Sequence, residues 1–239
     1  MIAQLSDPHV RLPEEHGSAD ALARAVGAVL ELEPLPDAVL VTGDLAEHAN
    51  GAEYARVREL LEPLTMPVHV LPGNHDDPVA MREHFPLVGD GPYRYAVTCG
   101  DLRLVACDTT LARRDDGELD LEWLAAQLAD DAPTIVAMHH PPLLTGIGGL
   151  DAIGLPAAQR AALADLLARS PHVRRVVAGH VHRGAFGMLG GCGVVACPST
   201  NLQTRLEVRD EGFEIGDDPS AFVVHLMVGD ELVSHVQPI

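Results

Sequence analysis

Five short clusters of polar residues carry the side chains of this chain that could do chemistry. They follow one another along the sequence as Asp7-Pro8-His9, Gly43-Asp44, Gly73-Asn74-His75-Asp76, His139-His140 and Gly179-His180-Val181-His182. Carboxylate, imidazole and amide oxygen are ligand types that suit divalent zinc, manganese, iron or cobalt. The clusters contain no cysteine, and the lack of thiolates disfavours a purely structural zinc site.

Each cluster alone has an ordinary explanation. Gly-Asp is a common turn pair, an Asn after Gly73 suits a left-handed turn, and paired histidines are often surface residues. Together the clusters supply seven candidate ligands, which are Asp7, His9, Asp44, Asn74, His139, His180 and His182. Seven ligands give four to each of two ions when one Asp is shared, and positions for water and a substrate stay open. The conjunction therefore favours a dinuclear metal centre.

The clusters directly follow five apolar runs that predict buried strands, at residues 1–6, 38–42, 67–71, 134–138 and 173–178. Helical patterns lie between them at residues 18–32, with Ser18 as a candidate cap, and at 51–64, 118–128 and 156–168. Ligands of α/β sheets bind outside the carboxyl ends of the strands. Distant clusters are therefore expected to converge on one crevice.

The remaining segments predict hairpins and one loop. Residues 93–98 and 102–106 favour a hairpin, and the C-terminal runs at 187–196, 206–208, 213–215, 221–227 and 231–236 favour further hairpins. A Gly- and Pro-rich stretch at 141–155 is expected to be a mobile loop over a site. We expect one domain over residues 1–239, with residues 184–239 as a β-rich part and a candidate interface in a homo-oligomer.

Composition restricts the class of partner. The formal net charge is −19, which argues against long nucleic acid because such binding needs a dense basic surface. Bound cations would supply the positive potential that an anionic substrate requires. No run of about 18 apolar residues is present, and the first residues carry no basic region, so we expect a cytoplasmic protein without a membrane partner.

The five clusters, in this order, resemble the motifs of the calcineurin-like metallophosphoesterase superfamily, D-x-H, G-D, G-N-H-D, H-H-P-P and G-H-x-H. The match extends from Asp7 to His182. Within the superfamily, Thr42-Gly43-Asp44-Leu45 and Met138-His139-His140-Pro141-Pro142 are similar to the class III cyclic nucleotide phosphodiesterases and bacterial glycerophosphodiesterases. The D-R-G sequence of protein Ser/Thr phosphatases does not follow Gly43-Asp44, so that branch is disfavoured.

The resemblance implies an α/β fold, a four-layer sandwich of two mixed β-sheets flanked by helices. It also implies the ligand sets: Asp7, His9 and His182 for the first metal, Asn74, His139 and His180 for the second, and Asp44 as the bridge. Spacing alone would place His180 and His182 on one metal, because residues i and i+2 of an extended chain point the same way.

By the same matching, three other side chains take part in catalysis. His75 is expected to contact a phosphate oxygen or to protonate the leaving alkoxide, and Asp76 to orient the His75 ring. His140, the neighbour of ligand His139, is expected to support the site or to contact the substrate.

The resemblance thus implies a hydrolase that acts on a small phosphodiester, with 3′,5′-cyclic nucleotides as the leading substrate class. A glycerophosphodiesterase or a broad phosphomonoesterase would use the same centre. A non-catalytic scaffold of the same fold is a further alternative, disfavoured because all seven ligand positions carry competent residues.

Overall fold

Two β-sheets form the centre of the computed structural model, which describes residues 1–14, 17–87 and 91–239. The first sheet has the order β13-β12-β1-β2-β3, with the bounds β1 Ile2–Leu5, β2 Ala38–Thr42, β3 Val68–Leu71, β12 Ala221–Val228 and β13 Glu231–Pro238. The second has the order β4-β5-β6-β7-β9-β8, with the bounds β4 Tyr95–Cys99, β5 Leu102–Ala106, β6 Thr134–Ala137, β7 Val173–Ala178, β8 Ala185–Leu189 and β9 Cys192–Ala196. A small ladder pairs β10 (Gln203–Thr204) with β11 (Ile215–Gly216).

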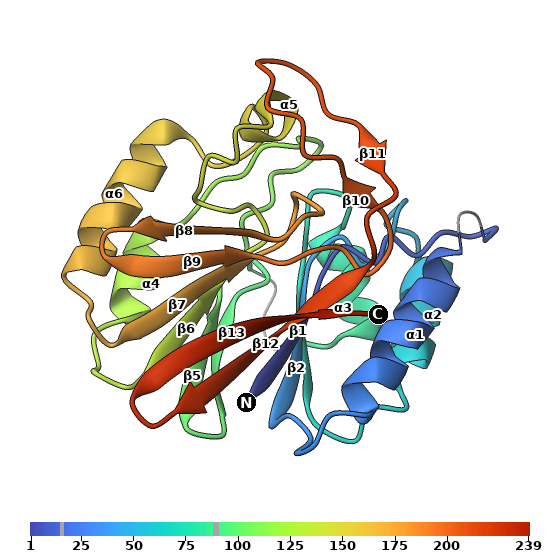
Figure 1. Cartoon of the computed structure of the whole chain (residues 1–239), viewed down its shortest axis with the longest axis horizontal. Coiled ribbons are helices and arrows are strands. Elements are labelled where there is room, and N and C mark those ends of the chain that lie inside the picture. Colours follow the sequence, from blue (N-terminus) through green and yellow to red (C-terminus); the bar gives the residue numbers. More distant parts are fainter. Residues whose placement is uncertain (15–16, 88–90) are drawn as a thin grey trace.

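Helices cover the outer face of each sheet (Figure 1). Apolar side chains of α1 (Ser18–Leu30) and α2 (Gly51–Leu61) pack with those of the first sheet, and those of α4 (Leu121–Gln127) and α6 (Ala157–Ala168) pack with the second. A third apolar cluster, which includes Leu40 of β2 and Leu104 of β5, fills the space between the sheets. The structure confirms the predicted four-layer sandwich.

Both sheets are mixed, and their parallel parts carry the predicted ligand loops. β1, β2 and β3 run parallel in the first sheet, as do β5, β6 and β7 in the second. The C-terminal strands extend both sheets, because β12 pairs antiparallel with β1 and β9 pairs with β7. Residues after 184 are thus shared between the two sheets.

Some boundaries differ from the prediction. Helix α1 begins after Gly17, whose left-handed backbone (φ 64°) forms the N-cap, and the hydroxyl of Ser18 instead accepts a hydrogen bond from the Arg11 amide. Helix α2 ends at Leu61, shortly before Pro63, which has no amide hydrogen to donate to the preceding turn.

The C-terminal prediction was wrong at residues 206–208, where no strand forms, and β10 lies earlier, at Gln203–Thr204. Two short helices, α3 (Pro78–His84) and α5 (Gly148–Asp151), were not predicted, and α5 lies within the expected loop at 141–155. No helix of the described segments is long and apolar enough to cross a membrane.

Candidate metal centre

The backbone of the candidate ligands is strained. Asp7, His9, Asp44, His180 and His182 all have positive φ, between 46° and 71°. Non-glycine residues adopt this left-handed conformation at a cost that the surrounding structure must offset, and such residues concentrate at functional sites. The strain turns five ligand side chains sharply out of the strand ends and into one space.

Two glycines allow the ligand loops to approach closely. A Cβ at Gly43 (φ +91°) would lie 2.3 Å from Nδ1 of His139, and one at Gly73 would lie 2.2 Å from Oδ1 of Asp44. Any larger residue would push the loops after β2, β3 and β6 apart. The Gly-Asp and Gly-Asn pairs of the sequence therefore have a steric role in addition to their ligands.

The first group of ligand atoms comes from Asp7, His9, Asp44 and His182, which all lie within 4.8 Å of one another. Nδ1 of His9 donates to the Glu47 carboxylate at 2.7 Å, and Nδ1 of His182 donates to the Leu202 carbonyl at 2.9 Å. Both Nε2 atoms are then unprotonated in the neutral rings, and they face each other at 3.0 Å. Their close approach requires either a proton on one nitrogen or a metal ion bound by both.

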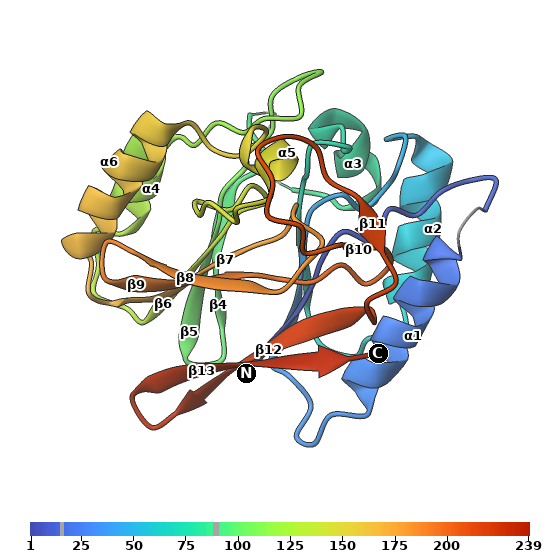
Figure 2. The same ribbon diagram turned by 45° about the horizontal axis from the view of Figure 1, so that its top comes forward.

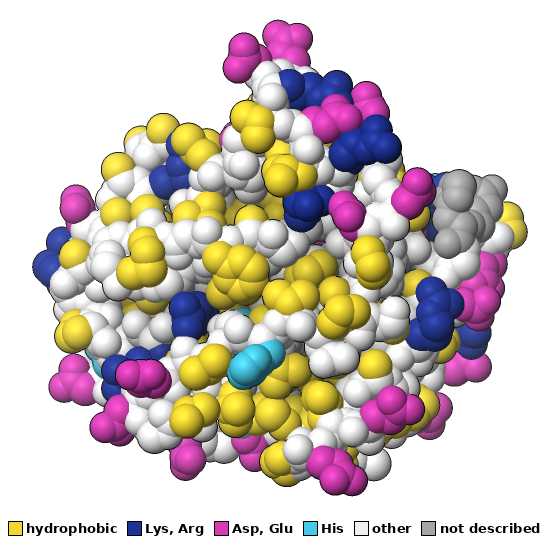
Figure 3. All heavy atoms as spheres, in the orientation of Figure 1, with side chains coloured by type: hydrophobic (Ala, Val, Ile, Leu, Met, Phe, Trp, Pro, Cys, Tyr) yellow, Lys and Arg dark blue, Asp and Glu magenta, His cyan; other side chains and the backbone are white. Residues whose placement is uncertain are grey.

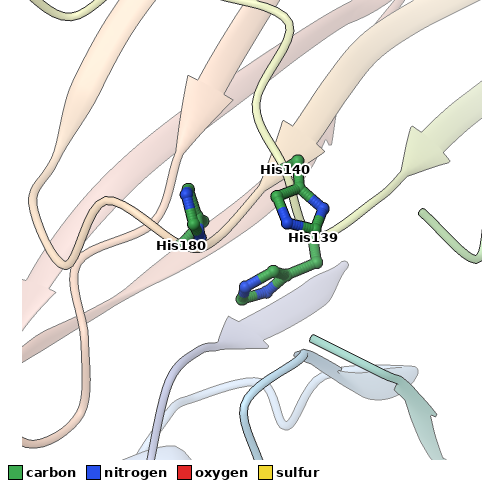
Figure 4. Close-up of side chains that lie close together, drawn as sticks. All are labelled: His139, His140 and His180. Carbon is green, nitrogen blue, oxygen red and sulfur yellow. The ribbon is translucent and has the colours of Figure 1, made fainter. Parts of the chain in front are cut away.

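The second group comes from the loops after β3, β6 and β7. Nδ1 of His139 donates to the Thr42 carbonyl at 2.8 Å, which leaves its Nε2 as an acceptor 3.0 Å from Oδ1 of Asn74. The same oxygen lies 3.0 Å from Nδ1 of His180, and Figure 4 shows the His139 and His180 rings side by side. The other nitrogen of His180 is buried and has no hydrogen-bond partner among the described residues. Acceptor atoms therefore converge here as well.

Asp44 lies between the two groups. Its Oδ2 is 3.3 Å from Nε2 of His9 and 3.5 Å from Nε2 of His139. Its Oδ1 is fixed by a 2.9 Å hydrogen bond from the His75 amide. One carboxylate oxygen is thus within reach of an imidazole from each group, which is the position that a bridging ligand occupies.

The buried carboxylates create a strongly negative potential. Burial opposes a charged imidazole, but Asp44 and other carboxylates outweigh it and raise the pKa of His9 to about 10 and that of His139 to about 9. The same two histidines hold the pKa of Asp44 well below its usual range in spite of burial. The site thus attracts positive charge, and bound metal ions would displace these protons.

His75 lies at the edge of the centre, with its side chain 38% exposed. Its ring is 4.7 Å from the His9 ring, and its Nδ1 lies 3.3 Å from the backbone carbonyl of Glu47. Asp76 does not orient this ring as expected, because its carboxylate accepts hydrogen bonds from the backbone of Gly73 and Leu45 and from the Tyr54 hydroxyl. Burial and Asp44 raise the pKa of Asp76 to about 6. Asp76 therefore holds the ligand loops together.

His140 is fully buried, and both of its ring nitrogens are engaged by the protein. Nδ1 lies 2.8 Å from the Thr109 hydroxyl, and Nε2 donates to the Asp115 carbonyl at 3.0 Å. Burial and the neighbouring His139 lower its pKa to about 3. Although it lies close to His139 and His180 (Figure 4), it is placed to support the loop after β6.

Glu47 was not among the predicted site residues. Its carboxylate accepts from Nδ1 of His9 and, at 2.7 Å, from the Arg11 guanidinium, and it lies 3.8 Å from Nδ1 of His75. An acid three residues after Asp44 is the only signal in the sequence, and it resembles an ordinary solvated residue. Glu47 meets these partners only because folding brings the loops after β1 and β2 together.

A cavity of about 270 Å³ opens at the candidate metal centre. Its lining includes the candidate ligands His9, Asp44, Asn74, His180 and His182, together with Arg11, Glu47 and His75. This volume lies near the lower limit for small-molecule sites, which span roughly 300–1,000 Å³. A small substrate can therefore contact the candidate ligands from one open side.

Comparisons with known proteins agree with this geometry. The sequence model of the family described as calcineurin-like phosphoesterase matches residues 1–184. The glycerophosphodiester phosphodiesterase GpdQ of Enterobacter lignolyticus is 33% identical over 98% of this chain and 90% of its own length. The 3′,5′-cyclic adenosine monophosphate phosphodiesterase CpdA of Pseudomonas aeruginosa is 32% identical over 85% of this chain and 77% of its own. A dimetal phosphatase from Danio rerio shares the fold, with a TM-score of 0.72 at 17% identity over 99% of this chain and 95% of its own.

Proposed function

The chain belongs to the calcineurin-like phosphoesterase family, and on that premise we propose that it hydrolyses small phosphodiesters at a dinuclear metal centre, with 3′,5′-cyclic nucleotides as its natural substrates. The observation that carries the proposal is the position of Asp44 Oδ2 between two groups of converging acceptor atoms. Relatives named as phosphodiesterases, at 32–33% identity, support diesters as the substrate class.

We assign the ligands as the two groups suggest. Asp7, His9 and His182 hold the first ion, Asn74, His139 and His180 hold the second, and Asp44 binds both. When bound, two divalent ions neutralise phosphate oxygens and lower the pKa of a coordinated water. Nitrogen and oxygen ligands of this kind accept manganese, iron, zinc or cobalt.

The residues of the chain itself position the substrate and move a proton. His75 lines the cavity, and donation from its Nδ1 to the Glu47 carbonyl turns Nε2 away from that contact. From this place Nε2 can bind a phosphate oxygen or give a proton to the leaving alkoxide. Arg11 lines the same cavity beside Glu47 and offers a positive charge to the phosphate.

Substrate profiling tests the proposed activity. The manganese-supplied protein is assayed with bis(p-nitrophenyl) phosphate, p-nitrophenyl phosphate, cyclic AMP and a glycerophosphodiester. We expect both the aryl diester and cyclic AMP to be hydrolysed faster than the monoester. Turnover of the monoester alone would refute the proposal.

The same assay distinguishes the proposed function from a second candidate, hydrolysis of glycerophosphodiesters. This candidate is favoured by the similarity to GpdQ, which extends over 98% of the chain. Preference for the glycerophosphodiester over cyclic AMP would select it.

Metal analysis tests the centre independently of activity. Protein purified without chelators and supplied with manganese should hold two ions per chain by elemental mass spectrometry. Fewer than one tightly bound ion would contradict the ligand assignment and favour a non-catalytic scaffold.

A further inference from the structure

The cavity over the candidate metal centre is lined by apolar side chains as well as by the candidate ligands. Five apolar side chains contribute to this lining, and we call them the apolar roof: Leu150, Ile153, Leu202, Phe213 and Ile215. Phe213 and Ile215 are 46% and 47% exposed. Exposed apolar surface inside a substrate cavity is unfavourable in water, at roughly 25 cal/mol per Å², and becomes favourable when a ligand covers it.

Two segments far apart in the sequence build the roof, and their backbones bind each other. The amide of Gly148 donates to the Arg209 carbonyl at 2.9 Å, and that of Gly149 donates to the Gly212 carbonyl at 3.1 Å. A Cβ at Gly148 would lie 2.1 Å from the Asp210 carbonyl oxygen. Figure 2 shows the resulting arch, in which the segment between β10 and β11 passes beside α5. The roof is therefore a built structure and not a loose flap.

The roof is also fixed to the metal centre. The Leu202 carbonyl accepts from Nδ1 of His182, and the Thr204 amide donates to the His182 carbonyl at 3.0 Å. The β10–β11 ladder then carries Ile215 opposite Thr204. A group bound under the roof thus has a defined position relative to a phosphate at the ligands.

The arch segment carries ion pairs on its surface, and its exposed side chains Leu206 and Val208 do not line the cavity. Arg209 pairs with Glu214 at 3.1 Å, and Arg205 lies 3.5 Å from Glu207. In Figure 3 basic and acidic side chains cover the projection above β10 and β11. Phe213 and Ile215, in contrast, line the cavity and can contact a bound substrate.

From this arrangement we infer that the apolar roof is the subsite for a nucleobase, with Phe213 as its stacking partner. The inference rests on the proposed phosphodiesterase function and specifies which part of the substrate, beyond the phosphate, the site binds. A base presents a flat, weakly polar face to Phe213 and Ile215, whereas the hydroxyl groups of glycerol would find no hydrogen-bond partner in these two side chains. Stacking of a base on an aromatic side chain favours binding of the ligand that carries the base.

Two inhibitors that differ only in the base test the subsite. We measure inhibition constants of adenosine 5′-monophosphate and ribose 5-phosphate against hydrolysis of bis(p-nitrophenyl) phosphate, in the manganese-loaded wild type and in Phe213→Ala and Ile215→Ala. The wild type should bind the nucleotide about 10-fold more tightly than the sugar phosphate. Phe213→Ala should reduce this ratio to about 2 or less, and Ile215→Ala should reduce it by a smaller factor.

Leu206→Ala is the matched control, because Leu206 lies in the same segment and is 57% exposed but does not line the cavity. It should leave the ratio unchanged. Equal inhibition by the two ligands in the wild type, or a ratio that Phe213→Ala and Leu206→Ala change alike, would overturn the inference. If the wild type hydrolyses no diester, the proposed function fails, and calorimetric binding of the same two ligands still tests the roof by itself.

Discussion

Substitution of Glu47 should weaken binding of the first metal ion and leave binding of the second unchanged. The Glu47 carboxylate accepts from Nδ1 of His9 at 2.7 Å, and this bond holds the ring with Nε2 toward the ligand group. Removing a carboxylate that orients a ligating histidine typically costs 10- to 100-fold in metal affinity. Since the Glu47 side chain is only 19% exposed, solvent screens the interaction weakly.

The size of the effect should depend on the residue introduced. Glu47→Ala removes the acceptor and should lower affinity for the first ion about 10- to 100-fold, which is about 1.4–2.7 kcal/mol. Glu47→Gln keeps a neutral acceptor, and neutral hydrogen bonds are about half as strong as charged ones. Affinity for the first ion should therefore fall about 3- to 10-fold.

Competition with a chromophoric chelator measures both affinities in one titration of the apoprotein. Glu59→Gln is the control, because it makes the same chemical change in an exposed ion pair with Arg56 on α2. The reasoning is refuted if both Glu47 variants hold the first ion as tightly as the wild type. Equal weakening of both ions would show instead that Glu47 supports the whole loop.

The other predictions concern the proposed bridging ligand Asp44, the proposed general acid His75 and the pH dependence of stability. Asp44→Ala should lose both metals together, whereas Asn74→Ala should chiefly lose the second, and elemental mass spectrometry after desalting gives the two counts. His75→Ala should lower kcat about 10²- to 10⁴-fold for cyclic AMP and much less for bis(p-nitrophenyl) phosphate, whose leaving group needs no proton; an equal loss on both substrates would contradict an acid role. Burial lowers the pKa of His225 to about 3, so its neutral ring contributes stability above pH 6.5 that is lost, by up to about 1.4 kcal/mol per pH unit, as pH falls from 6.5 toward 3. Urea unfolding at pH 7 and pH 5 should show a smaller pH effect in His225→Gln than in the wild type, and identical pH effects would argue against this histidine.

The strand ends were predictable because their signal is local. Apolar runs of five or six residues predicted β1, β2, β3, β6 and β7 within one or two residues of their observed bounds. The polar clusters after them predicted which loops meet, since parallel strands end at one edge of a sheet. Pairing of the strands, in particular the insertion of β12 beside β1, depends on contacts more than 200 residues apart and has no local signal.

The roles of the catalytic candidates were less predictable. Asp76 follows His75 directly, yet its carboxylate binds backbone amides of the loop after β2, and Glu47 takes the place beside His75. His140 follows a ligand, yet both of its nitrogens bind the loop that contains Thr109 and Asp115. Residues that are neighbours in sequence point to different sides of a sharply turned loop. A residue next to a candidate ligand therefore need not form a hydrogen bond with it.

By itself the sequence identified the family to which the chain belongs, and it predicted the types of candidate ligand, their number and their division between two ions. Only the tertiary structure gives the position of Asp44 Oδ2 near Nε2 of both His9 and His139, because that position depends on loops from two sheets. The apolar roof has no signal along the chain, because Leu150 and Phe213 belong to distant segments whose backbones bind each other in the folded state. Ligand identity is a property of single side chains, whereas the shape above them arises from packing between distant segments.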